Sequence, residues 1–285
     1  MAIQETDVWE MRKESALTRE EMRHFNEQGY VHLGRVATEP EIEALCGRID
    51  EIMLGEVKYD GMRMQLCPSF EQGSHTTKFT EGFKQSTLKY RKIQDLEDDP
   101  LFRAYMQAPA FRAITRQLIG ERASVFRAMF MNKPSGGGTR LRWHQDGACY
   151  QNLDSGWDMT LPPRVTIWTA LDATTRENGC LQIVPGTHHG VLSATKKDLL
   201  TEEETARFCT PDKIVHLEMQ RGEVVLLHNW TLHSSDPNRT PYPRRAFSVC
   251  YLDAATRQLS TGRAYPQIFP DYQPVKDKVL SEEKY

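Results

Sequence analysis

The sequence lacks an excess of charge of either sign. Its 285 residues include 36 Lys and Arg against 39 Asp and Glu, a formal net charge of −3 with neutral histidines. This balance excludes a generally basic nucleic-acid-binding protein, and no nucleic-acid partner is expected. Long apolar runs are missing as well. The longest aliphatic run of the C-terminal half, Val224–Leu227, is far shorter than the ~20 residues that cross a bilayer, so no membrane span is expected.

Cysteine is scarce, with six residues and no Cys-x-x-Cys pair. This scatter favours neither a disulfide framework nor a zinc site, and it predicts reduced, buried thiols in a cytoplasmic protein. The sequence also contains no internal repeat and no low-complexity stretch, which argues against a repeat architecture. A chain of this length, 39% hydrophobic, can bury a core without covalent cross-links.

Helix signals dominate residues 16–121. Thr18 with Glu21 forms a capping box, and the helix that it opens is expected to stop at Gly29, before a short strand over 30–33. Apolar residues at helical spacing predict helices over 40–54 and 97–120. The intervening segment 55–90 has no sustained period, and we expect it to be an irregular, lid-like stretch.

Short strands separated by turns follow from residue 122 onward. Their number and spacing predict an all-β sandwich or barrel core over 122–255. The whole chain, 1–285, is interpreted as a single domain, with helices packed outside the core and a C-terminal extension over 256–285. The predicted strands are 124–132, 139–146, 164–172, 180–184, 213–217, 223–228 and 246–252.

A His-x-Asp triplet is the most specific chemical feature. If 139–146 is a strand, His144 and Asp146 point to one side, as a metal requires; the alternative is a His–Asp pair in a polar core. A second imidazole, from His228 or His233, would complete a two-histidine, one-carboxylate facial triad. Such a triad leaves three positions open on Fe(II). An arginine downstream, Arg244 or its neighbour, would suit the carboxylate of a 2-oxo acid.

The order of these motifs resembles the phytanoyl-CoA dioxygenase family of Fe(II)/2-oxoglutarate-dependent oxygenases. The resemblance covers roughly residues 18–252, and the segments that carry it are 20–33, 91–93, His144-Gln145-Asp146, 168–172, 177–181, 184–188 and 233–244.

The resemblance implies a mainly β fold, a double-stranded β-helix (jelly roll, cupin-like) with flanking N-terminal α-helices. It implies Fe(II), 2-oxoglutarate and O₂ as cofactor and co-substrates, and it selects His233 over His228 and Arg244 over Arg245. The implied metal ligands and catalytic residues are His144, Asp146 and His233. The implied co-substrate residues are Arg244, Ser235, Lys92, Met129, Gln145 and Trp168.

The retained Asp146 bears on the reaction, because halogenases similar to this family carry Ala or Gly there. The resemblance therefore favours hydroxylation of a C–H bond in a small-molecule substrate, lipid-like or natural-product-like, with release of succinate and CO₂. Desaturation, epoxidation and ring formation use the same ligands, and a non-oxidative cupin-type metal protein is a further alternative. Arg140 and Arg142 share the parity of His144 and would meet an anionic substrate, unless the strand starts later and both are solvated.

Overall fold

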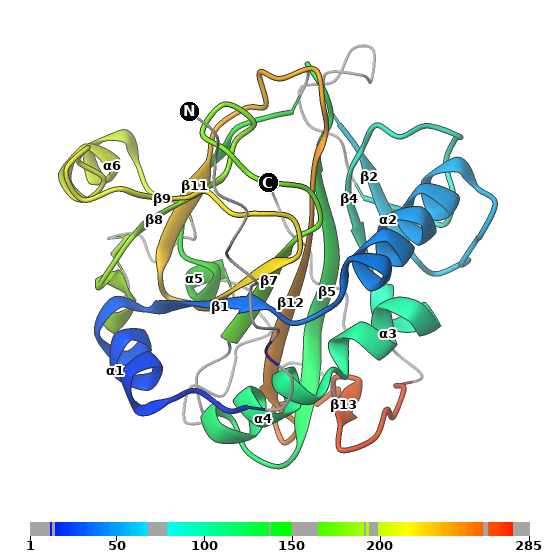
Figure 1. Cartoon of the computed structure of the whole chain (residues 1–285), viewed down its shortest axis with the longest axis horizontal. Helices are drawn as coiled ribbons and strands as arrows, with labels where there is room; N and C mark the ends of the chain where they lie inside the picture. The colour runs from blue at the N-terminus through cyan, green and yellow to red at the C-terminus, as the bar shows by residue number, and fades with distance from the viewer. Residues whose placement is uncertain are drawn as a thin grey trace, which may run out of the picture.

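Two antiparallel sheets stack on each other in the computed structural model, which describes residues 12, 15–67, 79–136, 138–149, 165–190, 192–193, 199–258 and 262–275 (Figure 1). The major sheet has nine strands in the order β1-β10-β7-β12-β5-β4-β2-β3, with β13 paired to β5. The minor sheet has the order β6-β11-β8-β9. This arrangement confirms the predicted mainly β jelly roll.

The strands are as follows. The major sheet contains β1 (Tyr30–Arg35), β2 (Arg63–Leu66), β3 (Thr80–Glu81), β4 (Tyr90–Gln94), β5 (Ala123–Lys133), β7 (Val165–Ala170), β10 (Glu223–His228), β12 (Arg244–Asp253) and β13 (Gln267–Phe269). The minor sheet contains β6 (Leu141–His144), β8 (Leu181–Val184), β9 (Val215–Leu217) and β11 (Leu232–Ser235).

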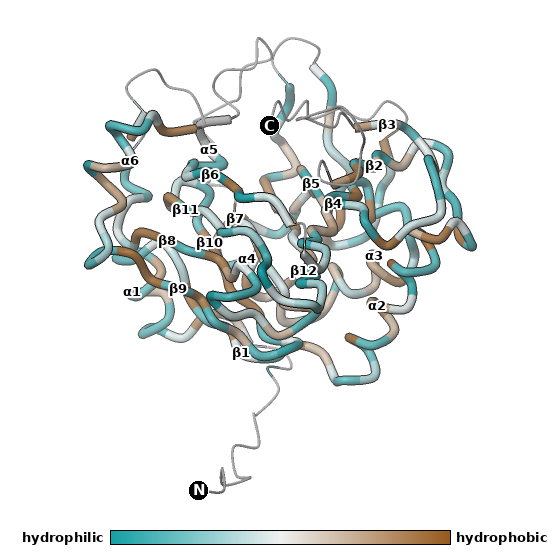
Figure 2. The backbone as a smooth tube through the Cα atoms, turned by 90° about the horizontal axis from the view of Figure 1, so that it is seen from above, coloured by the Kyte–Doolittle hydropathy of each residue, from teal (hydrophilic) through white to brown (hydrophobic). Residues whose placement is uncertain are grey.

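Helices α1 (Arg19–Gln28), α2 (Glu39–Leu54), α3 (Pro100–Met106) and α4 (Pro109–Leu118) contribute to the core on the outer face of the major sheet. Two further helices, α5 (Asp146–Cys149) and α6 (Glu202–Phe208), lie on the side of the minor sheet (Figure 1). The 3₁₀ turns are η2 (Leu96–Asp98) and η3 (Thr187–His189). Seen from above, α2 and α3 lie on one side of β5 and β12, and the minor sheet lies on the other side (Figure 2). None of the helices that the structure describes is long and apolar enough to cross a membrane.

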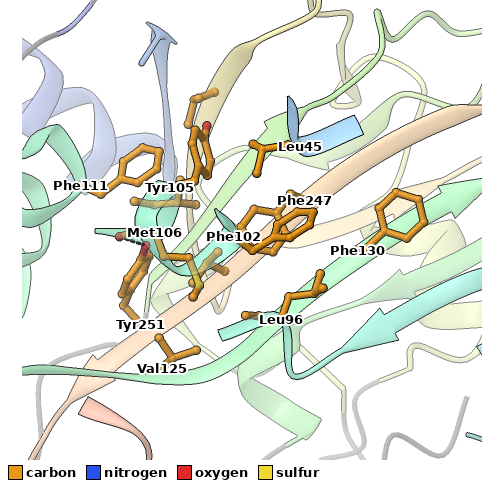
Figure 3. Close-up of a cluster of buried hydrophobic side chains, with 14 of the residues drawn as sticks. Leu45, Leu96, Phe102, Tyr105, Met106, Phe111, Val125, Phe130, Phe247 and Tyr251 are labelled. Atoms are coloured by element: carbon orange, nitrogen blue, oxygen red, sulfur yellow. Dashed lines mark hydrogen bonds between the residues drawn. The ribbon is translucent and has the colours of Figure 1, made fainter. Parts of the chain in front are cut away.

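The major sheet is buried on both faces, and its side chains alternate between two cores. Phe247 and Val249 of β12 join the core under the helices, where Phe247 meets Phe102 edge-to-face with ring centroids 4.8 Å apart (Figure 3). Ala246, Trp168 and Leu227 face the minor sheet in a second, smaller core. Burial on both faces explains why these strands are continuous apolar runs instead of alternating ones.

The helix predictions are confirmed at the N-terminus and wrong in detail further on. Thr18 and Glu21 form the expected capping box of α1, and Gly29 ends that helix at φ +79°. The single helix expected over 97–120 is instead η2, α3 and α4. Pro109 is the first residue of α4, and a proline there cannot donate the backbone hydrogen bond that would continue α3.

The predicted boundaries of the β core are too narrow. Strands β1, β2, β3 and β4 from the N-terminal third extend the major sheet, and β13 from the region 256–285 pairs with β5. Within the segment 55–90, Arg63–Leu66 is a fully buried strand that pairs with β4, so this part belongs to the sheet and is not irregular. Its sequence, Arg-Met-Gln-Leu, does alternate polar and apolar residues, but a run of four residues is too short to identify a strand. Residues 68–78 lie outside the described residues.

Candidate metal centre and co-substrate pocket

Three side chains from two neighbouring elements of the minor sheet and one short helix converge between the sheets. His144 ends β6, and the antiparallel register places His233 of β11 directly opposite it, with ring centroids 4.1 Å apart. Asp146 is the first residue of α5. One ligand atom from each lies within 4.8 Å of the others, and no other such group occurs within the described ranges.

The prediction that strand alternation brings His144 and Asp146 together is wrong, although the two side chains do meet. The strand ends at His144, so Asp146 reaches the site from a turn of helix and not by strand parity. A register shift in the pairing of β6 with β11 also interrupts the alternation of side chains before His144. Leu141, three residues before His144, therefore lines the same cavity as His144. Arg140 and Arg142 are exposed: Arg140 pairs with Asp236, and Arg142 donates to a backbone carbonyl.

Backbone carbonyls orient both imidazoles. Nδ1 of His144 lies 2.8 Å from the Arg142 carbonyl oxygen, and Nδ1 of His233 lies 2.9 Å from that of Thr231. A carbonyl only accepts, so the hydrogen-bond pattern places a proton on Nδ1 of each ring. Both Nε2 atoms are left as lone-pair donors toward the same point, 3.4 and 3.8 Å from Oδ1 of Asp146.

The protonation states suit metal binding. Burial alone would raise the pKa of Asp146, but the Arg127 guanidinium and the two imidazoles hold it well below its usual range. Burial, reinforced by His144, lowers the pKa of His233 to about 4. At neutral pH the site therefore offers a carboxylate and a neutral imidazole, the forms that ligate metals.

The cavity at the triad is lined by several of the residues that sequence reasoning assigned to the co-substrate. Lys92, Met129 and Trp168 reach it from β4, β5 and β7. Gln145 does not line it. Its amide nitrogen donates to the carbonyls of Thr187, Gly190 and Trp230, so it braces the loops behind the metal centre.

A second cavity adjoins the first and contains Arg244 and Ser235. Lys92, Met131 and Leu141 line both cavities. Arg244 is 2% exposed, and its Nε and Nη1 have no hydrogen-bond partner among the described residues. Burial lowers its pKa to about 10, so it is still protonated at neutral pH. A buried guanidinium with unused donors is costly, which points to an anionic ligand at this position.

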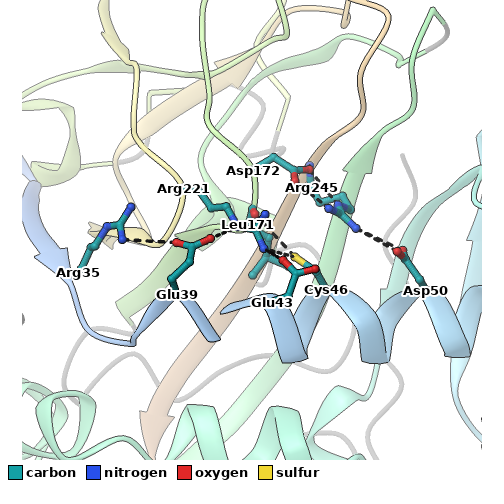
Figure 4. A network of polar contacts seen from close by, with 9 residues as sticks. All are labelled: Arg35, Glu39, Glu43, Cys46, Asp50, Leu171, Asp172, Arg221 and Arg245. Carbon is teal, nitrogen blue, oxygen red and sulfur yellow. Dashed lines mark hydrogen bonds and ion pairs between the residues drawn. The ribbon is translucent and has the colours of Figure 1, made fainter. Parts of the chain in front are cut away.

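The rival residues lie elsewhere. Arg245 points to the opposite face of the sheet, where it pairs with Asp172 and Asp50 (Figure 4). Nδ1 of His228 accepts a hydrogen bond from the Trp230 backbone amide, and the ring packs against Phe25, so this half-buried histidine lies outside the triad.

Two cations of these cavities were missed by sequence reasoning. Arg127 lines the metal cavity, and Lys133 lies opposite Arg244 in the β5–β12 register and donates to the Thr139 carbonyl at 2.7 Å. Burial, followed by Arg244 and Arg91, holds the pKa of Lys133 well below its usual value. Strand alternation could have identified both residues, because Arg127 and Lys133 are an even number of residues from Met129 and so lie on the same face of β5.

Stacked sheets enclosing a two-histidine, one-carboxylate set define the class of jelly-roll proteins with a facial-triad metal centre. Within that class, the model of the phytanoyl-CoA dioxygenase family matches residues 25–246, and the chain belongs to this family of Fe(II)/2-oxoglutarate-dependent oxygenases. It is therefore an oxidoreductase of that family, as the motif order indicated.

Comparison with individual proteins agrees with this family assignment. The chain is 29% identical over 258 residues to a probable phytanoyl-CoA dioxygenase of Caenorhabditis elegans, covering 85% of this chain and 77% of that protein. Among solved structures, EctD from S. alaskensis with 2-oxoglutarate and 5-hydroxyectoine superposes with a TM-score of 0.68 at 20% identity, over 90% and 93% of the two chains. The carbocyclase SnoK from nogalamycin biosynthesis gives 0.63 at 22% identity, over 85% and 86%. Both structures share the fold.

Proposed function

We propose that this protein is an Fe(II)/2-oxoglutarate-dependent dioxygenase that hydroxylates an unactivated C–H bond of a small, lipid-like or natural-product-like molecule. The observation that carries the proposal is the buried triad together with Arg244 in the adjoining cavity, whose Nε and Nη1 have no hydrogen-bond partner among the described residues. A simple metal-binding protein has no use for that second feature, whereas a co-substrate with two carboxylates uses both.

His144, Asp146 and His233 would hold the metal. Two imidazoles and one carboxylate suit Fe(II) and leave positions for a bidentate 2-oxo acid and O₂. When bound, Fe(II) supplies the coupled chemistry in which O₂ and 2-oxoglutarate yield succinate, CO₂ and one oxygen atom inserted into the substrate C–H bond.

The remaining residues bind the co-substrate and exclude water. Arg244 would receive the distal carboxylate with its planar fork, assisted by Ser235 and by Lys92, which reaches both cavities. Trp168 and Met129 are buried apolar residues that line the cavity at the triad, and they would strengthen charge interactions there by excluding water. The protein's task is to fix this geometry before the reaction.

The single-domain organisation is also part of the proposal. Pairing of β1 with β10 and of β4 with β5 ties the N-terminal third into the same sheet as the proposed site. A cytoplasmic location is supported by five described cysteines that form no disulfide with one another, at positions 46, 67, 180, 209 and 250.

Succinate formation from 2-oxoglutarate tests the proposal. We expect the purified protein, screened with fatty acyl-CoA, terpenoid, amino-acid-derived and sugar-like compounds, to release succinate only with Fe(II), O₂ and an accepted substrate. Product mass then separates hydroxylation, a gain of one oxygen, from desaturation, a loss of two hydrogens. Conversion of substrate with Zn²⁺ alone and without O₂ would instead establish a non-oxidative cupin-type enzyme.

A further inference from the structure

Arg127 holds one oxygen of the proposed carboxylate ligand. It lies on β5, is 7% exposed, and places Nη2 3.2 Å from Oδ2 of Asp146. The other oxygen, Oδ1, faces the two imidazoles at 3.4 and 3.8 Å from their Nε2 atoms. We infer that Arg127 is a positioning residue that makes Asp146 a one-oxygen metal ligand, an inference that rests on the proposed function.

The backbone of Asp146 is fixed independently of Arg127. The amide of Gly147 donates to the Asn229 carbonyl at 2.7 Å, and a Cβ on Gly147 would lie 2.6 Å from the Trp230 indole. The turn carrying Asp146 is therefore clamped against the loop before β11. The rotation of the carboxylate about its own side-chain bonds is the remaining freedom, and the contact with Arg127 removes it.

The number of carboxylate oxygens on the metal decides how many positions remain. A carboxylate with both oxygens free can bind one ion through one or both of them. A second oxygen from Asp146 would occupy one of the three positions that a 2-oxo acid and O₂ need. By engaging Oδ2, Arg127 keeps that position open.

Among the groups that orient the three ligands, Arg127 can be removed by a side-chain substitution. The imidazoles are oriented by the carbonyls of Arg142 and Thr231, which no side-chain substitution removes. The carboxylate is oriented by a side chain, so this contact can be deleted while the ligands stay. Arg63 provides a matched control, because it makes an equally buried pair with Asp95 at 2.8 and 3.0 Å on β2, outside the residues that line the metal cavity.

Co(II) is the probe, because its visible ligand-field absorption reports coordination number without turnover. We expect Co(II)-loaded Arg127→Met to differ from wild type in band intensity and position before any 2-oxoglutarate is added. Its affinity for 2-oxoglutarate should fall about ten-fold. Arg127→Lys, which keeps the charge and reaches one bond less far, should recover part of both properties. Arg63→Met should lower the melting temperature and keep the wild-type spectrum.

Superimposable spectra of wild type and Arg127→Met would overturn the inference, as would the same spectral change in Arg63→Met. If Arg127→Met does not fold, the spectrum and the 2-oxoglutarate affinity of Arg127→Gln are compared with wild type in the same way. The glutamine side chain is polar, but it is two bonds too short to place its amide at the position of Nη2. Failure of the proposed function is separate: wild-type Co(II) protein would then bind no 2-oxoglutarate, while the ligand-free spectra still decide the role of Arg127.

Discussion

The two faces of the nine-stranded sheet are built from the same strands but have different roles: one packs against the helices, and the other carries the proposed site. On the outer face, Phe247 and Val249 pack under the helices in a core of tightly buried apolar side chains. On the inner face, the alternate positions of the same strand carry Arg244 and Ser248 beside the proposed metal and co-substrate cavities. The outer face contributes the larger hydrophobic core, and the inner face combines a smaller apolar cluster with the polar side chains of the proposed site.

Two adjacent arginines show the difference most sharply. Arg245 on the outer face has its charge matched by Asp172 and Asp50, and these ion pairs raise its pKa against the opposing effect of burial. Arg244 on the inner face is more deeply buried and keeps two nitrogens without a partner among the described residues. A satisfied buried charge indicates structure, and an unsatisfied one indicates a ligand.

The largest effect is expected from the inner face. His233→Ala should lower turnover at least about 1,000-fold, because it removes a metal ligand and with it several kcal/mol of transition-state stabilisation. The folded state should persist, since His233 is neutral and no charge is left uncompensated. Succinate formation and thermal melting measure the two properties. His228→Gln is the control, and a comparable loss of turnover there would reassign the distal ligand.

The next effect belongs to the outer face. Phe247→Ala should lower the free energy of unfolding by about 4 kcal/mol, because it opens a cavity against Phe102 and Tyr105. Ser248→Ala, one residue along and on the inner face, should change it by less than about 1 kcal/mol. Urea denaturation of both variants checks the contrast. Equal destabilisation by the two would mean that the faces do not divide stability and function.

A smaller effect concerns pH. Burial, aided by His188 and His189, lowers the pKa of His228 to about 4 from 6.5. The unfolded chain therefore binds this proton first as pH falls, and stability present above about pH 6.5 is lost progressively down to about pH 4. Between pH 7 and 4.5 the loss from this group is about 2 kcal/mol. His228→Gln should flatten the stability–pH profile of the metal-free protein by that amount, and an unchanged profile would contradict the assignment.

Short-range patterns in the sequence predicted much of the fold. The capping box of α1 could be predicted because its two residues are three positions apart, and strands β5, β7, β10 and β12 could be predicted because each is a short, largely apolar run. The family resemblance selected Arg244 over Arg245. The triad could be named because its members lie in short motifs.

Long-range contacts were not predictable. The contact of Arg127 with Asp146 joins a strand to a helix that sequence reasoning took for strand, and the pairing of β2 into the sheet depends on burial from both sides. The role of Gln145 depends on three carbonyls from two distant loops. Each depends on tertiary packing that no local spacing encodes.

Calorimetric titration of 2-oxoglutarate into Co(II)-loaded Arg244→Met and Arg245→Met under anaerobic conditions tests the central claim most directly. We expect Arg244→Met to weaken binding at least about 30-fold through loss of charge-assisted hydrogen bonds, without a loss of melting temperature. Arg245→Met should bind like wild type and melt earlier, because Asp172 and Asp50 lose their partner. Wild-type affinity in Arg244→Met, or equal weakening in both variants, would contradict the division of the sheet into a structural and a functional face.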